Sequence, residues 1–179
     1  MNNTALLIID TQVGLMASAY KSKEVLDNIN ILLAQARTSR TPVIYVQHDG
    51  PTGHGLAVGS PAWAIHPMIT PQAGEIIVHK RASDSFYDTM LKRELEAQGI
   101  EHLVIVGGET EYCVDTTIRR ATVEGYDVTL VSDAHTTTDY AEAILPAAQR
   151  IAYLNDVVDG FASDTHSITV KPTHEVTLS

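Results

Sequence analysis

The sequence has little cysteine: Cys113 is the only one among 179 residues. A single thiol excludes an internal disulfide framework and any cysteine-rich metal site, because both need at least two cysteines. Aromatic side chains make up only 6% of the chain, and Trp63 is the one tryptophan. No apolar run approaches the roughly 20 residues of a membrane-spanning helix.

Positive charge is also in deficit, since 12 lysines and arginines face 22 acidic residues for a net charge of −10. Such a surface repels nucleic acid and anionic membranes, so we expect neither as a partner. No basic segment followed by an apolar stretch opens the chain, and we expect a cytoplasmic protein that acts on a small molecule. Nucleotide-binding loops are missing as well, because Gly107 and Gly108 belong to no phosphate-binding glycine pattern.

What the sequence does contain is 44% hydrophobic residues, which predicts one globular domain over residues 1–179. Short apolar runs alternate with segments of helical periodicity, which predicts an α/β fold. We expect a doubly wound, mostly parallel, Rossmann-like sheet of five to six strands, with helices on both faces in three layers. The predicted strands are residues 5–9, 43–46, 75–78, 103–106 and 127–131. The predicted helices are residues 25–36, 91–99 and 112–124, and a last one with residues 144, 145, 148, 151 and 152 on its buried face.

Two boundaries stay open. The last helix can begin at Asp139, which is a good N-cap, or later, because Pro146 fits best in a first turn. Residues 163–179 form a possible C-terminal extension, in which residues 168–170 are either an added strand or a partner-binding tail.

Cys113 follows the fourth predicted strand and lies at the start of the predicted helix 112–124. Unpaired N–H groups and the helix dipole favour an anion there, so we predict a lowered thiol pKa and a reactive nucleophile. The alternative is a small buried hydrophobic residue, which is the commoner role of a lone cysteine.

Asp10 ends the first predicted strand, and Lys80 follows the third. In a sheet of order 3-2-1-4-5, ligands bind at the carboxyl ends of the strands where the order reverses. Singly, Asp10 is equally explained as a helix cap and Lys80 as a solvated lysine. Because both share this edge with Cys113, we predict that acid, cation and thiol line one crevice.

Several motifs resemble the isochorismatase-like cysteine hydrolase family, within the isochorismatase/nicotinamidase superfamily. They are residues 108–117 (Gly-Glu-Thr-Glu-Tyr-Cys-Val-Asp-Thr-Thr), 6–12 (Leu-Leu-Ile-Ile-Asp-Thr-Gln), 78–80 with 84–86 and Thr89, and 133–137 (Asp-Ala-His-Thr-Thr). They occur in the family's order between residues 5 and 161. The resemblance implies a doubly wound fold, a homodimer or homotetramer, no cofactor, and a catalytic triad of Cys113, Asp10 and Lys80.

The resemblance also implies roles for these residues. Cys113 attacks a carbonyl and forms a thioester, Asp10 moves the proton, and Lys80 favours both anions. The backbone N–H groups of Glu109 and Cys113 form an oxyanion hole, beside a non-proline cis peptide at Gly108–Glu109. The expected substrate-pocket residues are Gln12, Trp63, Phe86 and Tyr112.

The cysteine distinguishes among family members. Isochorismatases proper cleave a vinyl ether without it, so Cys113 favours hydrolysis of a C–N bond. Nicotinamidases carry an Asp-Trp-His-Pro type metal motif after the second strand, whereas residues 47–50 here are Gln-His-Asp-Gly. We therefore predict a metal-independent cysteine hydrolase of a small amide, ureido or carbamoyl compound. The alternatives are a vinyl ether hydrolase and a non-catalytic binding homologue.

Other polar residues flank these motifs. His48, His54 and His66 are irregularly spaced around the long loop 49–71, which favours loop or pocket roles over metal ligation. Asp133 and His135 fit structural or supporting roles. Three carboxylates near the cysteine have two possible roles. They are either charges that suit a helix N-terminus, or they face the pocket and favour a cationic substrate. They belong to Glu109, Glu111 and Asp115.

Overall fold

Seven strands form one sheet in the order β3-β2-β1-β4-β5-β7-β6 in the computed structural model, which describes residues 3–178. All neighbouring strands are parallel except β6 and β7, so the predicted doubly wound, mostly parallel fold is confirmed with one strand more than expected. The strands are β1 (Thr4–Ile9), β2 (Val43–His48), β3 (Ile76–Lys80), β4 (His102–Gly108), β5 (Asp127–Thr136), β6 (Ala162–Ser163) and β7 (His166–Lys171).

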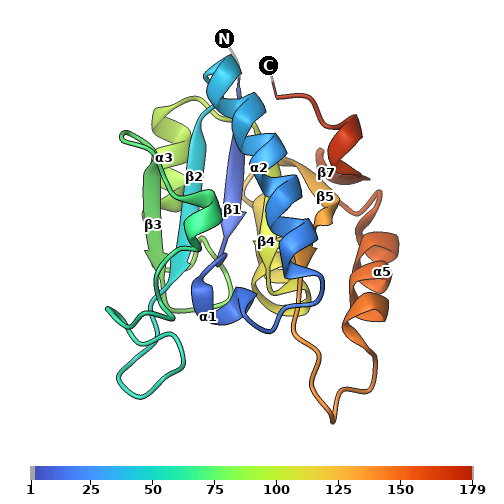
Figure 1. Ribbon diagram of the computed structural model, residues 1–179. Coiled ribbons are helices and arrows are strands. Elements are labelled where there is room, and N and C mark those ends of the chain that lie inside the picture. The colour runs from blue at the N-terminus through green and yellow to red at the C-terminus, as the bar shows by residue number, and fades with distance from the viewer. Residues whose placement is uncertain (1–2, 179) are drawn as a thin grey trace.

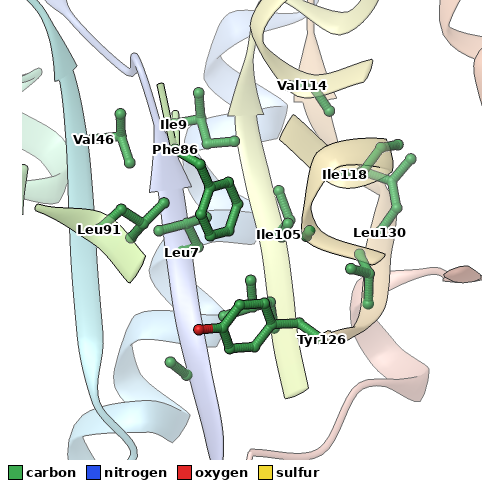
Figure 2. Close-up of a cluster of buried hydrophobic side chains, with 14 of the residues drawn as sticks. Leu7, Ile9, Val46, Phe86, Leu91, Ile105, Val114, Ile118, Tyr126 and Leu130 are labelled. Atoms are coloured by element: carbon green, nitrogen blue, oxygen red, sulfur yellow. The ribbon is translucent and has the colours of Figure 1, made fainter. Parts of the chain in front are cut away.

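Helices cover both faces of the sheet (Figure 1). On one face, Leu6 and Ile8 of β1 pack with Leu26 and other residues of the long helix α2. On the other face, Leu7 and Ile9 belong to a second cluster that includes residues of the remaining long helices (Figure 2). Burial on both faces explains why the central strands are uninterrupted apolar runs. The helices are α1 (Val13–Met16), α2 (Ser22–Ser39), α3 (Leu91–Ala97), α4 (Asp115–Val123) and α5 (Ala147–Val158).

The last helix buries other residues than the sequence pattern predicted. α5 begins at Ala147 with Pro146 as its N-cap, which confirms the later of the two expected starts. Leu154 and Val158 are its buried core residues, whereas Ile144 precedes the helix and is 97% exposed. The helical phase counted from Asp139 was wrong, because residues 139–146 form a loop. Asp139 nevertheless caps the helix, since its Oδ1 accepts a hydrogen bond from the Ala147 N–H.

Residues beyond α5 extend the sheet. Of the two possibilities for residues 168–170, the structure shows the strand: β7 runs parallel to β5, and Ile168 is buried. Val176 and Leu178 then pack into the cluster on the α2 face. Between residues 3 and 178, no helix is both long enough and apolar enough to cross a membrane.

A glycine lets the central strands approach each other near the carboxyl edge. Gly107 pairs with Ile9 across β4 and β1, and its φ of +121° lies in the region that favours glycine. A Cβ at this position would lie 2.0 Å from the Ile9 carbonyl oxygen, so no other residue fits without moving a strand. The ends of β1 and β4, which precede Asp10 and the Cys113 segment, are therefore held side by side.

Candidate active site

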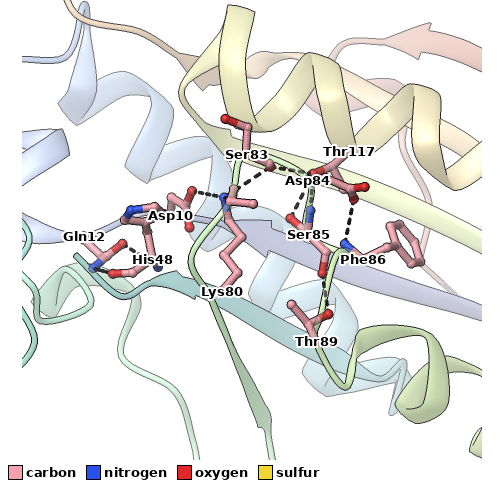
Figure 3. A network of polar contacts seen from close by, with 11 residues as sticks. Asp10, Gln12, His48, Lys80, Ser83, Asp84, Ser85, Phe86, Thr89 and Thr117 are labelled. Carbon is pink, nitrogen blue, oxygen red and sulfur yellow. Dashed lines mark hydrogen bonds and ion pairs between the residues drawn. The ribbon is translucent and has the colours of Figure 1, made fainter. Parts of the chain in front are cut away.

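Asp10, Lys80 and Cys113 converge at the carboxyl edge of the sheet. Asp10 directly follows β1, in a left-handed conformation with a φ of +46°, and Lys80 is the last residue of β3. Lys80 Nζ lies 2.7 Å from Asp10 Oδ2, and the two side chains are 0% and 1% exposed (Figure 3). Both groups lie close enough to Cys113 to shift the pKa of its thiol. The structure thus brings together the three residues that the sequence placed at this edge.

Backbone carbonyls of the following loop hold the Lys80 ammonium. Lys80 Nζ donates to the carbonyl oxygens of Ala82 at 3.0 Å and Ser83 at 3.3 Å. Thr117 of α4 fixes this loop, because its Oγ1 lies 2.8 Å from Ser85 Oγ and accepts from the Ser85 N–H (Figure 3). The loop after β3 is therefore tied to the helix that follows Cys113. This contact gives residues 84–89 a structural role.

A π-helical turn, η2 (Thr110–Val114), carries Cys113 and continues into α4. The helical segment begins two residues earlier than predicted, so Cys113 lies in its fourth position. The Gly108–Glu109 peptide is cis, as the family resemblance implied. The N–H groups of Tyr112 and Val114 donate to the Glu109 carbonyl oxygen, which fixes the start of this turn.

The predicted lowering of the Cys113 pKa is wrong. Burial raises the pKa of the thiol to about 12, the Asp10 carboxylate adds to the rise, and Lys80 opposes it. Burial also raises the pKa of Asp10, more than Lys80 and the thiol lower it. For Lys80, burial favours a lower pKa, but the Asp10 and Cys113 charges outweigh it and the pKa is raised. These shifts favour the protonated form of the Cys113 thiol at neutral pH.

This pKa predicts how Cys113 will react with iodoacetamide. We expect the alkylation rate constant to rise about tenfold per pH unit from about pH 6 to pH 9, because only the thiolate reacts. Mass spectrometry of the labelled protein measures the rate, with glutathione under the same conditions as the reference thiol. A rate that levels off below about pH 7 would show that the thiol is acidic.

Two expected pocket residues have structural roles instead. Gln12 is fully buried: its Oε1 accepts from the His48 N–H, and its Nε2 donates to the carbonyl oxygens of His48 and Trp63. Phe86 is 8% exposed and lies in the core, where its ring stacks on Tyr126 (Figure 2). The sequence could not distinguish these roles, because both residues lie beside catalytic motifs and only packing decides where they point.

The other two expected pocket residues are more accessible. Trp63 is half-buried, its Nε1 donates to Asp49 Oδ1, and its ring stacks on His79 at 5.8 Å. Tyr112 is 47% exposed and hydrogen-bonds with Tyr140. Both remain predicted substrate contacts.

The histidines have separate surroundings. His48 is the sheet partner of Lys80, and burial lowers the pKa of its ring. His54 Nδ1 and His66 Nδ1 each accept a backbone N–H in the long loop. Among residues 3–178, no group of three or more histidine, cysteine or acidic side chains is arranged to hold a metal. Independence of metal stays a prediction.

Arg150 is the residue near the site that the sequence did not indicate. Its guanidinium contacts Glu111, 39 residues away, and the carbonyl oxygen of Thr138. A lone arginine in a predicted helix carries no signal of such a long-range contact. His135 is 1% exposed and lies 2.9 Å from Thr110 Oγ1, in agreement with the supporting role suggested for it. Asp133 accepts hydrogen bonds from Thr173 of the C-terminal segment.

The fold and this site define a class of three-layer α/β domains with a partly exposed thiol beside a buried acid and a buried lysine at the sheet edge. The family model of the isochorismatase domain matches residues 4–159, and the chain belongs to the isochorismatase family.

Similar proteins include a streptothricin hydrolase from Streptomyces noursei, 38% identical over 151 residues that cover 83% of this chain and 53% of that protein. The chain therefore spans about half the length of that relative. A ureidoacrylate amidohydrolase from Klebsiella pneumoniae is 28% identical, over 92% of this chain and 84% of that protein. Among solved structures, an isochorismatase from Pseudomonas putida KT2440 has a TM-score of 0.88 at 32% identity, covering 98% of this chain and 90% of that chain.

Proposed function

We propose that this protein is a cysteine hydrolase that cleaves the C–N bond of a small amide, ureido or carbamoyl compound through a thioester. The observation that carries the proposal is the buried ion pair of Asp10 and Lys80 beside the partly exposed thiol of Cys113. The names of the streptothricin hydrolase and the ureidoacrylate amidohydrolase, which describe hydrolysis, support it.

Acylation begins with a neutral thiol, because the Cys113 pKa is raised to about 12. As sulfur attacks the carbonyl carbon, the Asp10 carboxylate takes the thiol proton, and the raised pKa of Asp10 makes it a better base. The Lys80 ammonium, at 2.7 Å from Asp10, stabilises the developing negative charge. The backbone N–H groups of Glu109 and Cys113, at the start of the helical segment, hold the oxyanion of the tetrahedral intermediate. When the C–N bond breaks, Asp10 gives its proton to the leaving nitrogen.

Deacylation reverses these roles with water as the nucleophile. Asp10 accepts a proton from water as the water oxygen attacks the thioester carbonyl. The tetrahedral intermediate collapses, the C–S bond breaks, and the proton returns to the sulfur as the acid leaves. Within residues 3–178, the Asp10 carboxylate oxygens have no hydrogen-bond partner beyond the ion pair with Lys80, so the carboxylate is free to carry this proton.

A screen tests the proposal. Small primary amides and ureido compounds are incubated with the protein, and ammonia release is measured with the Cys113→Ala variant as the blank. We expect at least one compound to release ammonia only with the intact protein. Ammonia release that persists in the variant would exclude Cys113 as the nucleophile.

The same assay tests the absence of a metal. Because no metal-binding cluster exists among the described residues, we expect dialysis against a chelator to change the rate by less than about twofold. Loss of activity that added zinc restores would contradict metal independence.

A further inference from the structure

Arg150 of α5 lies behind the turn that carries the nucleophile. We propose that Arg150 is a positioning residue, which acts through Glu111 to fix η2 and the backbone N–H groups of Glu109 and Cys113 in place for acyl transfer. The inference rests on the proposed function, because it assigns Arg150 a role in that reaction.

The Arg150 guanidinium is almost fully engaged and its side chain is 11% exposed. Nη1 donates to Glu111 Oε1 and lies 3.5 Å from Thr137 Oγ1. Nη2 donates to the Thr138 carbonyl oxygen at 2.6 Å, and Nε donates to the Leu145 carbonyl oxygen at 3.1 Å. One side chain therefore joins both ends of the loop between β5 and α5 to η2. This arrangement uses the planar fork of arginine, which a lysine ammonium does not reproduce.

Glu111 is the link to the reacting groups. It lies in η2 between Glu109 and Cys113, whose backbone N–H groups are the proposed oxyanion donors. The Glu111 side chain is only 25% exposed, so its pairing with Arg150 is sheltered from water and stronger than a surface ion pair. Thr138 of the same loop also lies close enough to the Glu109 carboxylate to lower its pKa, against the larger rise that burial causes. A shift of this loop would move both oxyanion donors.

A second contact holds the start of η2 from the same helix. Thr110 Oγ1 lies 2.9 Å from His135 Nδ1, and His135 Nε2 lies 2.9 Å from Asn155 Oδ1 of α5. The Asn155 amide nitrogen donates to the Ser132 carbonyl oxygen, so Oδ1 faces the histidine as an acceptor. Burial lowers the pKa of His135, which leaves Nδ1 neutral and able to accept the Thr110 hydroxyl. η2 is thus attached to α5 at two positions, and Arg150 provides the charged one.

The groups that act on the thiol come from other elements, namely Asp10 after β1 and Lys80 of β3. Loss of Arg150 should therefore disturb the oxyanion donors more than the sulfur. Acylation needs those donors, whereas alkylation of sulfur by iodoacetamide forms no oxyanion. Comparison of these two reactions separates a positioning role from general support of the fold.

The experiment measures two reactions of Cys113 in the full-length protein. Acetylation by p-nitrophenyl acetate is followed as the burst of p-nitrophenolate, and alkylation by iodoacetamide is followed by mass spectrometry. We expect Arg150→Met to slow acetylation about 10- to 100-fold, because a displacement of about 1 Å has effects of that size. Alkylation should change less than about threefold. Arg150→Lys should recover only part of the acetylation rate.

Glu111→Gln keeps the side-chain shape without its charge, and carries the test if Arg150→Met does not fold. It should slow acetylation similarly, and the double variant should be no slower than the slower single variant. Arg119→Met is the matched control, because Arg119 pairs with Asp115 at 2.7 Å and stacks on Phe161 but lies on the outer part of α4. It should leave both rates unchanged.

Equal loss of both reactions in the Arg150 and Glu111 variants would overturn the inference, since it indicates damage to the fold or to the thiol. Unchanged acetylation would also overturn it. Slow acetylation in Arg150→Met with a normal rate in Glu111→Gln would show that the effect does not pass through Glu111. If the unsubstituted protein is alkylated but never acetylated, the proposed function itself fails, and this inference fails with it.

Discussion

Replacing Cys113 by alanine or serine should lower kcat on an amide substrate by about 10⁴-fold or more, as the loss of a catalytic nucleophile does in other hydrolases. The fold should survive, because the thiol is partly exposed and its loss opens only a small space. The decisive measurement is the single-turnover rate, together with mass spectrometry of the acyl-enzyme. The added mass of the acyl group should appear on the unsubstituted protein and on neither variant.

Thr116→Ala is the matched control for this change, since Thr116 is exposed on the helix that follows Cys113. It should keep full activity and the same circular dichroism spectrum. Turnover that survives in Cys113→Ala but disappears in Asp10→Asn would instead favour the ether-cleaving alternative, in which the acid acts without the thiol. If turnover survived in both Cys113→Ala and Asp10→Asn, the site would have no catalytic role.

Lys80→Met should produce the largest loss of stability from a single substitution at the site. The free energy of unfolding should fall by about 3–5 kcal/mol, because the change leaves the buried Asp10 carboxylate without its cation. Urea denaturation at neutral pH measures this loss. The double variant Asp10→Asn/Lys80→Met should recover most of it, since no uncompensated charge then remains.

Lys92→Met is the control for the removal of an ammonium. Lys92 lies 2.6 Å from Glu124, but its side chain is 47% exposed, so water replaces the pair at little cost. We expect a change of less than about 1 kcal/mol for this surface pair. If Lys80→Met and Lys92→Met were equally mild, the pair of Asp10 and Lys80 would be hydrated in solution. The role assigned to it in acylation would then be wrong.

The ends of the strands could be predicted from the sequence, because they depend on patterns of neighbouring residues. Continuous apolar runs identified strands buried on both faces, and the chain topology placed Asp10, Lys80 and Cys113 at one edge. The start of the last helix could also be predicted, because Pro146 restricts the backbone around it. Such features depend on a few neighbouring residues.

Features that depend on contacts between residues far apart in the chain could not be predicted from the sequence. The buried face of α5 was misassigned, since its phase depends on a loop of irregular shape. Gln12 and Phe86 were assigned to the pocket, although one is fully hydrogen-bonded and the other lies in the core. Arg150 was missed because its partner Glu111 is remote in the sequence.

The sequence by itself determined the doubly wound α/β architecture, the strand ends and the identity of the three candidate catalytic residues. Only the tertiary structure decided the ionisation of the thiol. A position near a helix start favours a thiolate, but burial beside the Asp10 carboxylate favours the neutral form and raises the Cys113 pKa to about 12. Burial and the proximity of another charge depend on segments that meet only after folding.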